Sequence, residues 1–506
     1  MKQRKTATGA MHRARRALAG GLLMALLAAC SVGPAYKRPQ IDTPAAFKEA
    51  PTTAMTAQEA GTWEAAQPSD ALPRGQWWTI FGDETLNKLE SEALAANPDL
   101  QAAAARVRQS RAALDAARSA WFPEIDAGFG PTRERVSPAS QGLSQNANVP
   151  PVTLWRAQAT ASYEADLFGR VSSNVAATRA DSQQSEALYR SVQLALQADV
   201  AANYFALREL DTEQDIYRRT VAVREEGVKL VQHRFDEGEV SELDLAQAKN
   251  SLATARADAV GVARQRAAAE HSLALLLGKA PADFSFAQQP LVPVVARVPP
   301  GLPSALLERR PDIAAAERAM AAANSRVGLA KSAFFPRLDI TGAFGYEAAG
   351  LSELFKWSSR AFLLGPFAGT ALTLPLFDGG RRSAQLAEAR AQYDEDVSSY
   401  RSQVLKAFRE VEDSLADLRL LDDQIRAQTD AVNAAERAEH LSETQYREGQ
   451  VNYLDVLDSE RTVLVAQRQA SQLAGSQAVA TVSLIRALGG GWGDMKAQEA
   501  PQVAKQ

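Results

Sequence analysis

Cysteine is almost absent from this sequence, since its 506 residues include only one. A single cysteine excludes an intrachain disulfide framework and a cysteine-rich zinc site. Histidine is also scarce, and His233, His271 and His440 are isolated from one another, as surface residues of helices would be. The chain lacks the G-x-S-x-G, P-loop and G-x-G-x-x-G motifs. We therefore expect no enzyme, no metal site, no catalytic residues and no cofactor beyond any covalent modification.

Long apolar runs are missing after residue 29, where no stretch of about 18 or more apolar residues could form a spanning helix. The short apolar run 17–29 follows a basic region and ends at Leu27-Ala28-Ala29-Cys30. This pattern predicts a signal peptide over residues 1–29. It also resembles the lipobox of bacterial lipoproteins, which makes Cys30 the expected lipidation site; an ordinary secretion signal is the alternative. Ser31 resembles the outer-membrane sorting class.

Removal of residues 1–29 changes the charge of the chain. The full sequence has a formal net charge of −4, whereas the mature chain carries 50 Lys and Arg against 60 Asp and Glu, a net charge of −10. A negative chain without a basic excess argues against nucleic acid as a partner.

Proline is absent from 152–280 and from 376–500, whereas seven prolines fall between Pro281 and Pro311. A proline inside a helix costs about 3 kcal/mol, so both proline-free tracts are predicted to be helical. Gly238 and Gly449 are suited to end a helix within each tract. We expect two helical hairpins, with helices over about 169–236 and 241–278, and over about 380–447 and 452–488.

The mature chain contains one unit twice. Asn97-Pro98-Asp99-Leu100 recurs as Arg310-Pro311-Asp312-Ile313, and Trp121-Phe122-Pro123 recurs as Phe334-Phe335-Pro336, both at an offset of 213 residues. Leu277-Gly278 recurs as Leu488-Gly489 at an offset of 211. The predicted domains are a lipidated N-terminal extended or equatorial segment (30–82), a first repeat (83–280), a proline-rich linker (281–303), a second repeat (304–490) and a C-terminal tail (491–506).

Between the helices the sequence alternates with period two. From Trp155 to Leu167 every second residue is apolar and the residues between are polar, and such patterns predict strand hairpins over about 122–168 and 335–377. Trp155 and Tyr163 are about 26 Å apart along a strand, comparable to the roughly 25 Å apolar band between the aromatic girdles of a membrane barrel. A half-buried strand of a soluble sheet is the simpler alternative. Four strands cannot close a membrane barrel, so a barrel requires oligomerisation.

Several motifs carry a resemblance to a known family. They are VGPAYKRP (32–39), NPDL (97–100), ERRPDI (308–313), FFP (334–336), PLFDGGR (375–381) and GQVNYLDVLD (449–458). In this order they resemble the outer-membrane factor lipoproteins of tripartite efflux systems, which are TolC-like channels of the NodT-type branch. The resemblance implies a mixed all-α and membrane β-barrel fold. Four strands per chain would contribute to a trimeric twelve-stranded barrel, continued by a long periplasmic α-helical barrel.

The resemblance implies a passive exit duct in the outer membrane for small molecules such as drugs, toxic compounds or metal ions. It implies a homotrimer anchored in lipid, a periplasmic adaptor and an inner-membrane transporter of the RND type. The linker 281–303 and both terminal segments would form an equatorial layer around the helices. The rival hypothesis is a lipid-anchored periplasmic coiled-coil scaffold without a pore, which explains the helices and Cys30 but not the alternating strands.

The resemblance also implies a periplasmic gate at the tip of the second hairpin. Asp455 and Asp458 match luminal acidic positions, and three copies would form two rings that favour cations. Tyr446 and Asp244 match positions that hydrogen-bond between the tips in related channels. Val451 replaces a gate arginine of some relatives, which leaves open whether charge or packing closes the gate. The alternatives are helix capping for Asp455 and a solvated helix face for Asp458.

The tip loops are the candidate adaptor-docking sites. They comprise Gly238, Glu239, Val240 and Ser241 in the first hairpin, and Gly449, Gln450, Val451 and Asn452 in the second. Ordinary turn chemistry is the alternative, because the glycine of each loop suffices to end a helix. Both interpretations can hold together, since docking would use the same turns.

Overall fold

The computed structural model describes residues 32–49 except 40 and 45, 75–292 except 145, 309–363, and 372–490. The predicted signal peptide, the predicted lipidation site Cys30, residues 293–303 of the linker and the tail 491–506 lie outside these ranges. The chain folds as two compact units. The first comprises residues 1–39, 107–185 and 316–400, and the second comprises residues 40–106, 186–315 and 401–506.

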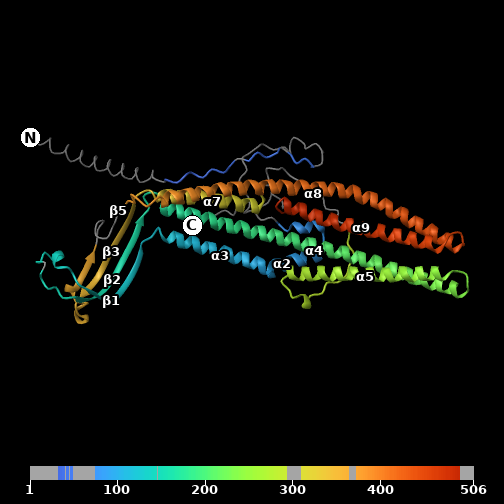
Figure 1. Ribbon diagram of the computed structural model, residues 1–506, viewed down its shortest axis with the longest axis horizontal. Coiled ribbons are helices and arrows are strands. Elements are labelled where there is room, and N and C mark those ends of the chain that lie inside the picture. The colour runs from blue at the N-terminus through green and yellow to red at the C-terminus, as the bar shows by residue number, and fades with distance from the viewer. Residues whose placement is uncertain are drawn as a thin grey trace, which may run out of the picture. The chain divides into compact units, whose positions relative to one another are not determined.

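The first unit contains an antiparallel sheet (Figure 1). Its strands are β1 (Glu124–Glu134), β2 (Val152–Ala165), β3 (Arg337–Ala348), β4 (Arg360–Leu363) and β5 (Leu372–Thr373). The order is β1-β2-β3-β4, and β5 also pairs with β3. Because β2 occupies the other edge of β3, β4 and β5 share one edge, and the sheet is four strands wide in the described residues.

The second strand hairpin differs in detail from the prediction of one continuous hairpin over 335–377. In the pairing with β3, Ala343 lies opposite Leu363 in β4, whereas Leu338 lies opposite Leu372 in β5. These two registers differ by four residues, so β4 and β5 are not one uninterrupted strand. The irregular apolar pattern of 360–377 is consistent with this break.

The period-two pattern produces one apolar and one polar face, because directly opposed residues of an antiparallel sheet share a face. Ala157 of β2 lies opposite Phe129 of β1 and Tyr346 of β3. On the polar face, Arg156 donates to Glu347 at 2.7 Å and lies 3.4 Å from Glu134. Ion pairs therefore run across three strands on one side, while aromatic and aliphatic side chains cover the other.

Four helices belong partly to each unit: α3 (Pro98–Ser119), α4 (Arg170–Asp236), α7 (Pro311–Ser332) and α8 (Arg381–Arg447). Each of the two longest begins behind an aspartate that satisfies free amide groups of the first turn. Asp166 accepts from the amides of Val171 at 2.9 Å and Ser172 at 2.8 Å. Asp378 accepts from the amides of Gly380 and Arg382, both at 3.1 Å.

The second unit adds α2 (Glu84–Ala96), α5 (Glu242–Leu276) and α9 (Tyr453–Ala487). Helices α4 and α5 form the first hairpin, and α8 and α9 form the second (Figure 1). The turns contain Gly238 and Gly449 at φ of 80° and 76°, which only glycine adopts readily. No described helix combines the length and the apolar composition needed to cross a membrane.

The largest core of the second unit joins both hairpins to the short amino-terminal helices. It includes Trp77 and Trp78 of η1 (Trp77–Phe81), Leu86 and Leu89 of α2, Tyr204 and Phe205 of α4, Leu273 of α5, and Val482 and Ile485 of α9. The indole nitrogen of Trp77 donates to Gln197 of α4 at 3.1 Å. This core fixes the helices of the two repeats against one another at the end away from the hairpin turns.

In each repeat, the residue before a short helix contacts the end of the second hairpin arm. The side chain of Asn97 donates to the carbonyl of Leu276 at the end of α5, at 2.9 Å. The corresponding Arg310 donates to the carbonyl of Ala487 at the end of α9, also at 2.9 Å. Both residues precede the proline that begins a helix, so each links a short helix to the end of the second hairpin arm.

Candidate functional site

The tips of the two helical hairpins meet in the second unit. All four helices contribute to this tip cluster, which comprises Val231, Leu245, Ala248, Tyr446, Tyr453 and Val456. The rings of Tyr446 and Tyr453 lie 5.3 Å apart. The guanidinium of Arg234 lies 4.8 Å from the centre of the Tyr446 ring, which is a favourable cation–π distance. The two hairpins are thus joined by packing around two tyrosines.

The structure does not pair Tyr446 with Asp244 as the resemblance implies. The hydroxyl of Tyr446 is buried and has no hydrogen-bond partner. The carboxylate of Asp244 accepts instead from the amide of Ser241 at 3.1 Å and from its hydroxyl at 2.8 Å. Both contacts lie within the first turn of α5, and Asp244 makes no bond to Tyr446. Val451 packs against the same cluster, so apolar contact holds the tips together here.

Asp455 and Asp458 lie three residues apart on one face of α9, and both side chains are exposed. Asp455 accepts from the amide of Asn452 at 3.1 Å, which is the capping contact weighed as its alternative role. No such contact involves the Asp458 carboxylate in the described residues. Capping uses one oxygen of Asp455, so both carboxylates remain available as exposed negative charges.

The two tip loops present mainly exposed residues. Glu239 and Gln450 are exposed, whereas Val240 and Val451 are half-buried against the tip cluster. A β-carbon added at Gly238 or Gly449 would meet no atom within 4 Å. The requirement for glycine is therefore the left-handed backbone conformation, and the space around each turn stays open.

A buried ion pair near the tips was not among the residues predicted from the sequence. Arg224 of α4 lies 3.7 Å from Glu460 of α9, and donates at 3.0 Å to the carbonyl of Ser251 in α5. Burial raises the pKa of Glu460 to about 7, an effect that Arg224 opposes and that Glu439 and Glu443 of α8 reinforce. This pair connects three helices and carries a group that titrates near neutral pH.

The spacing of these charges in the sequence could have revealed the pair. Arg224 lies seven residues from buried Tyr217 and seven from buried Val231, and Glu460 lies seven from buried Tyr453. Seven residues return a helix to nearly the same face. A charge at such a core position needs a partner, because an unpaired buried charge is costly.

The predicted girdle residues lie on the apolar face of the sheet. Trp155 stacks on Phe129 at a ring distance of 5.9 Å, and Tyr163 lies opposite Ile340. Within the described part of the chain the apolar face is exposed: Phe129 is 65% exposed and Phe362 is 70% exposed. A sheet of a soluble core would bury this face, so the soluble alternative does not account for it.

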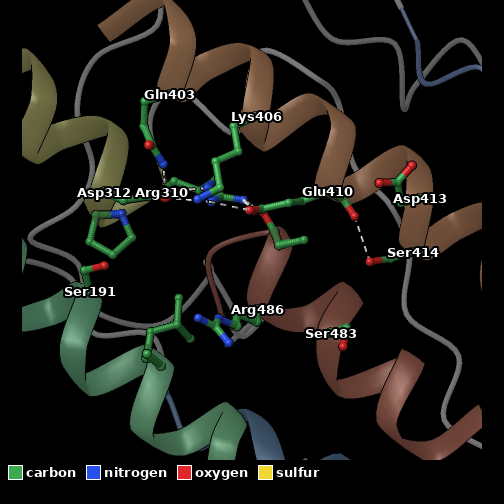
Figure 2. A pocket seen from close by; sticks show the side chains of 14 residues that line it. Ser191, Arg310, Asp312, Gln403, Lys406, Glu410, Asp413, Ser414, Ser483 and Arg486 are labelled. Atoms are coloured by element: carbon green, nitrogen blue, oxygen red, sulfur yellow. Dashed lines mark hydrogen bonds and ion pairs between the residues drawn. The ribbon is translucent and has the colours of Figure 1, made fainter. Parts of the chain in front are cut away.

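A polar cavity of about 620 Å³ lies in the second unit, between α4, α8, α9 and the start of α7. Figure 2 shows Arg310 between Asp312 and Glu410, with Gln403 on the far side of Asp312. The guanidinium lies 2.6 Å from Asp312 and 2.7 Å from Glu410. Gln403 donates to Asp312 at 2.6 Å. Burial raises the pKa of Asp312, but Arg310 outweighs it and the net pKa is lowered.

The charge of Arg310 is compensated by neighbouring carboxylates in this cavity. Arg310 is nearly fully buried and makes ion pairs with two carboxylates and a hydrogen bond to Ala487. The residues that line the cavity include no nucleophile that is hydrogen-bonded to a general base. Across the ranges that the structure describes, no group of three His, Cys, Asp or Glu could hold a metal ion. The arrangement links the start of α7 to α8 and to the end of α9.

The segment that follows Cys30 is fastened along the helices. In the first unit, Tyr36 donates to Glu317 at 2.6 Å, Arg38 donates to Tyr400 at 3.1 Å, and Asn324 donates to the carbonyl of Pro34 at 3.0 Å. In the second unit, the amides of Lys48 and Glu49 donate to Glu412 at 2.8 and 3.0 Å. We call residues 32–49 the strap.

Comparison with known proteins decides what this architecture is. The family model described as outer membrane efflux protein matches residues 89–279 and 302–490, which are the two repeats. The chain belongs to this family.

Relatives of known name cover nearly the whole length of this outer membrane efflux protein. The toluene efflux pump outer membrane protein TtgF of Pseudomonas putida is 35% identical over 94% of this chain and 97% of its own. Outer membrane protein OprJ of Pseudomonas aeruginosa is 33% identical over 93% and 95%. The solved outer-membrane channel OprN is 29% identical over 92% and 100%, with a TM-score of 0.80.

These likenesses confirm the fold class, the location and the general function predicted from the sequence. The protein is an outer-membrane exit duct of an efflux system, with long helices and a small antiparallel sheet as in TolC-like channels. It is a transport component. The two matched segments coincide with the repeats found by the offsets of 213 and 211 residues.

Proposed function

We propose that this outer membrane efflux protein works as a homotrimer whose sheets close into one twelve-stranded barrel. The observation that carries the proposal is the sheet itself. It is four strands wide, has one exposed apolar face, and in the described residues no chain segment pairs with the outer edge of β1 or of β5. Unpaired backbone groups are costly in lipid. Three copies supply a closed ring whose apolar face meets lipid and whose polar face lines a channel.

We also propose that Cys30 carries a lipid that anchors the chain at the membrane surface. The strap supports this placement. Gly33 lies against Gly328 in the first unit, four residues before α7 ends at Ser332 and nine before β3 begins. Three extended residues span at most about 11 Å, so a lipid on Cys30 would be within reach of the junction between helix and sheet. Failure of Cys30→Ser to abolish labelling by radioactive palmitate would contradict this proposal.

The partners that fit this duct are a periplasmic adaptor and an inner-membrane transporter of the RND type. The exposed turns at Gly238 and Gly449 are the proposed docking surface, because they form the ends of both hairpins and leave open space around the backbone. The linker and the terminal segments would form the equatorial layer. The cargo is a class of small molecules such as drugs, toxic compounds or metal ions; the name of the relative TtgF specifies toluene.

The proposed gate is the tip cluster, which holds the two hairpins together within each copy. Asp455 and Asp458 would form two acidic rings around the periplasmic opening, and opening would move the second hairpin outward. The absence of the Tyr446–Asp244 bond supports closure by packing around Tyr446, Tyr453 and Val451. The charges of Asp455 and Asp458 would then determine which ions pass, and would contribute little to holding the tips together.

The test is to purify the full chain from outer membranes in detergent and to measure its mass and its conductance in planar bilayers. A trimer with discrete, cation-preferring conductance steps is the expected result. A monomer without conductance would instead support the coiled-coil scaffold without a pore.

A further inference from the structure

Four phenylalanines mark the junctions between the sheet and the helices of the first unit. Phe168, after β2, stacks on Phe335, before β3, with ring centroids 5.0 Å apart and planes inclined by 25°. Phe122, before β1, is 70% exposed, and Phe377, after β5, is 92% exposed. Two of the four are therefore partnered within the chain and two are not.

The internal repeat relates the exposed pair to the stacked pair. Phe122-Pro123 corresponds to Phe335-Pro336 at the offset of 213 residues. Leu376-Phe377 corresponds to Leu167-Phe168, although the second repeat has two more residues before the arginine that begins its long helix. Phe122 and Phe377 thus correspond to the two stacked residues, and they lie at the two opposite edges of the sheet within one chain.

Phe168 and Phe335 continue the register in which β2 pairs with β3. Ala165 of β2 lies opposite Leu338 of β3. Three residues after Ala165 and three residues before Leu338, the same register places Phe168 opposite Phe335, where the rings are found in contact. The aromatic pair is therefore the end of the β2–β3 ladder, and its geometry predicts a register for the corresponding outer edges.

That register passes an independent check. If Phe377 of one copy lies opposite Phe122 of the next, Leu374 lies opposite Ile125 and Leu372 lies opposite Ala127. Leu372 belongs to the apolar face, because it lies opposite Leu338. Ile125 and Ala127 belong to the same face, because they lie opposite Ala161 and Ala159.

A shift of one residue would fail this check, since it would place apolar Leu372 opposite Asp126 or Gly128 on the polar face. The side chains that would meet are exposed in the single chain: Ile125 by 70%, Leu372 by 64% and Leu374 by 49%. Burial of these apolar side chains between copies would favour the contact.

We propose that residues 372–377 of one copy pair antiparallel with the start of β1 in a neighbouring copy, in this register, and that Phe377 stacks on Phe122 of that neighbour. The contact reproduces between chains the junction that Phe168 and Phe335 make within one chain. This contact rests on the trimer proposed above, and it specifies which residues join neighbouring copies in that trimer.

The test uses cysteine pairs in the full chain, expressed in cells and treated in outer membranes with a short thiol-specific crosslinker. Phe122→Cys combined with Phe377→Cys is expected to give covalent dimers and trimers on denaturing gels, at least tenfold above either single variant. Phe168→Cys combined with Phe335→Cys is the matched control and is expected to crosslink within one chain, without a ladder. The single variants also report any crosslink made by Cys30.

A second pair, Ile125→Cys with Leu374→Cys, tests the same register if the first pair does not reach the membrane. An amine-reactive crosslinker applied to the unmodified chain measures the trimer separately. If the amine reagent gives trimers but neither cysteine pair gives crosslinked dimers or trimers, the proposed contact is wrong and the proposed trimer is still supported. Absence of trimers with the amine reagent would overturn the proposed function itself.

Discussion

At the scale of single residues, the hairpin tips combine short-range capping with one long-range charge pair. Asp244 and Asp455 serve the first turns of their own helices. Arg224 and Glu460 connect α4 with α9 inside the packed region, at 3.7 Å. The first two carboxylates stabilise local structure, whereas the buried pair links one hairpin to the other.

Replacement of Glu460 should change how stability depends on pH. Because folding raises its pKa from 4.5 to about 7, the folded chain holds this proton more tightly than the unfolded chain. The stabilisation is complete below pH 4.5 and is lost as pH rises to about 7, by roughly 3 kcal/mol at most. Glu460→Gln should therefore match the parent near pH 4.5 and unfold at higher temperature near pH 8, as measured by circular dichroism.

The control for this experiment is Glu388→Gln, which changes an exposed glutamate of α8. It should leave the midpoint of thermal unfolding unchanged at both pH values. Equal midpoints for Glu460→Gln and its parent at pH 8 would show that Glu460 ionises as freely in the folded chain as in the unfolded one.

The two repeats allow a direct comparison of Arg310 with Asn97. Arg310→Ala leaves two carboxylates without their buried partner, which should cost roughly 3 kcal/mol of folding stability. Asn97→Ala removes uncharged hydrogen bonds at the corresponding contact, which should cost roughly 1–2 kcal/mol. Thermal unfolding of both variants measures the difference. A smaller loss in Arg310→Ala would mean that the ion pairs contribute little beyond the hydrogen bond to Ala487.

At the scale of elements, helix ends are defined by backbone conformation. Gly449 has a φ of 76° and no atom near the position of a β-carbon. Gly449→Asn should therefore retain conductance and unfold near the parent temperature, because asparagine tolerates this conformation. Gly449→Val should lose about 1–2 kcal/mol of stability at the second tip. Hydrogen exchange of α8 and α9 amides near the turn reports this loss, and equal exchange in both variants would contradict it.

The elements follow from the sequence more closely than the contacts between them. Absence of proline and the turn glycines predicted α4 over 169–236, and the structure has Arg170–Asp236. Period-two alternation likewise predicted β2. The Arg224–Glu460 pair joins segments far apart in the chain, so the spacing marks each residue as a core position without identifying its partner. The break between β4 and β5 likewise depends on how each segment pairs with β3. The structure also lacks a bond between Tyr446 and Asp244, whose carboxylate contacts Ser241 within its own turn.

At the scale of the whole molecule, the proposed trimer would bring three copies of each charge and surface together. Asp455 and Asp458 are exposed in the single chain, so in that trimer they would form the two proposed rings. Rings of carboxylates in a narrow pore attract cations. Asp455 also caps α9, whereas the Asp458 carboxylate makes no such contact in the described residues.

Asp455→Ala combined with Asp458→Ala should raise single-channel conductance and weaken cation preference in planar bilayers. The proposed reason is that two acidic rings at the opening would be removed. Asp458→Asn alone should weaken cation preference without loss of the Asp455 cap, which separates charge from helix stability. Conductance and ion preference identical to the parent in the double variant would place these carboxylates outside the conducting path.

The strap has a consequence for how the protein is made. Tyr36 contacts Glu317, 281 positions later in the chain, and Glu49 accepts at 2.8 Å from Arg419, 370 positions later. A chain that emerges from its amino terminus exports the strap first, yet Glu317, Tyr400 and Arg419 arrive only after most of the sequence has crossed the inner membrane. The earliest segment of the mature chain is therefore among the last to find its place, and during export it must travel without the surface that later holds it.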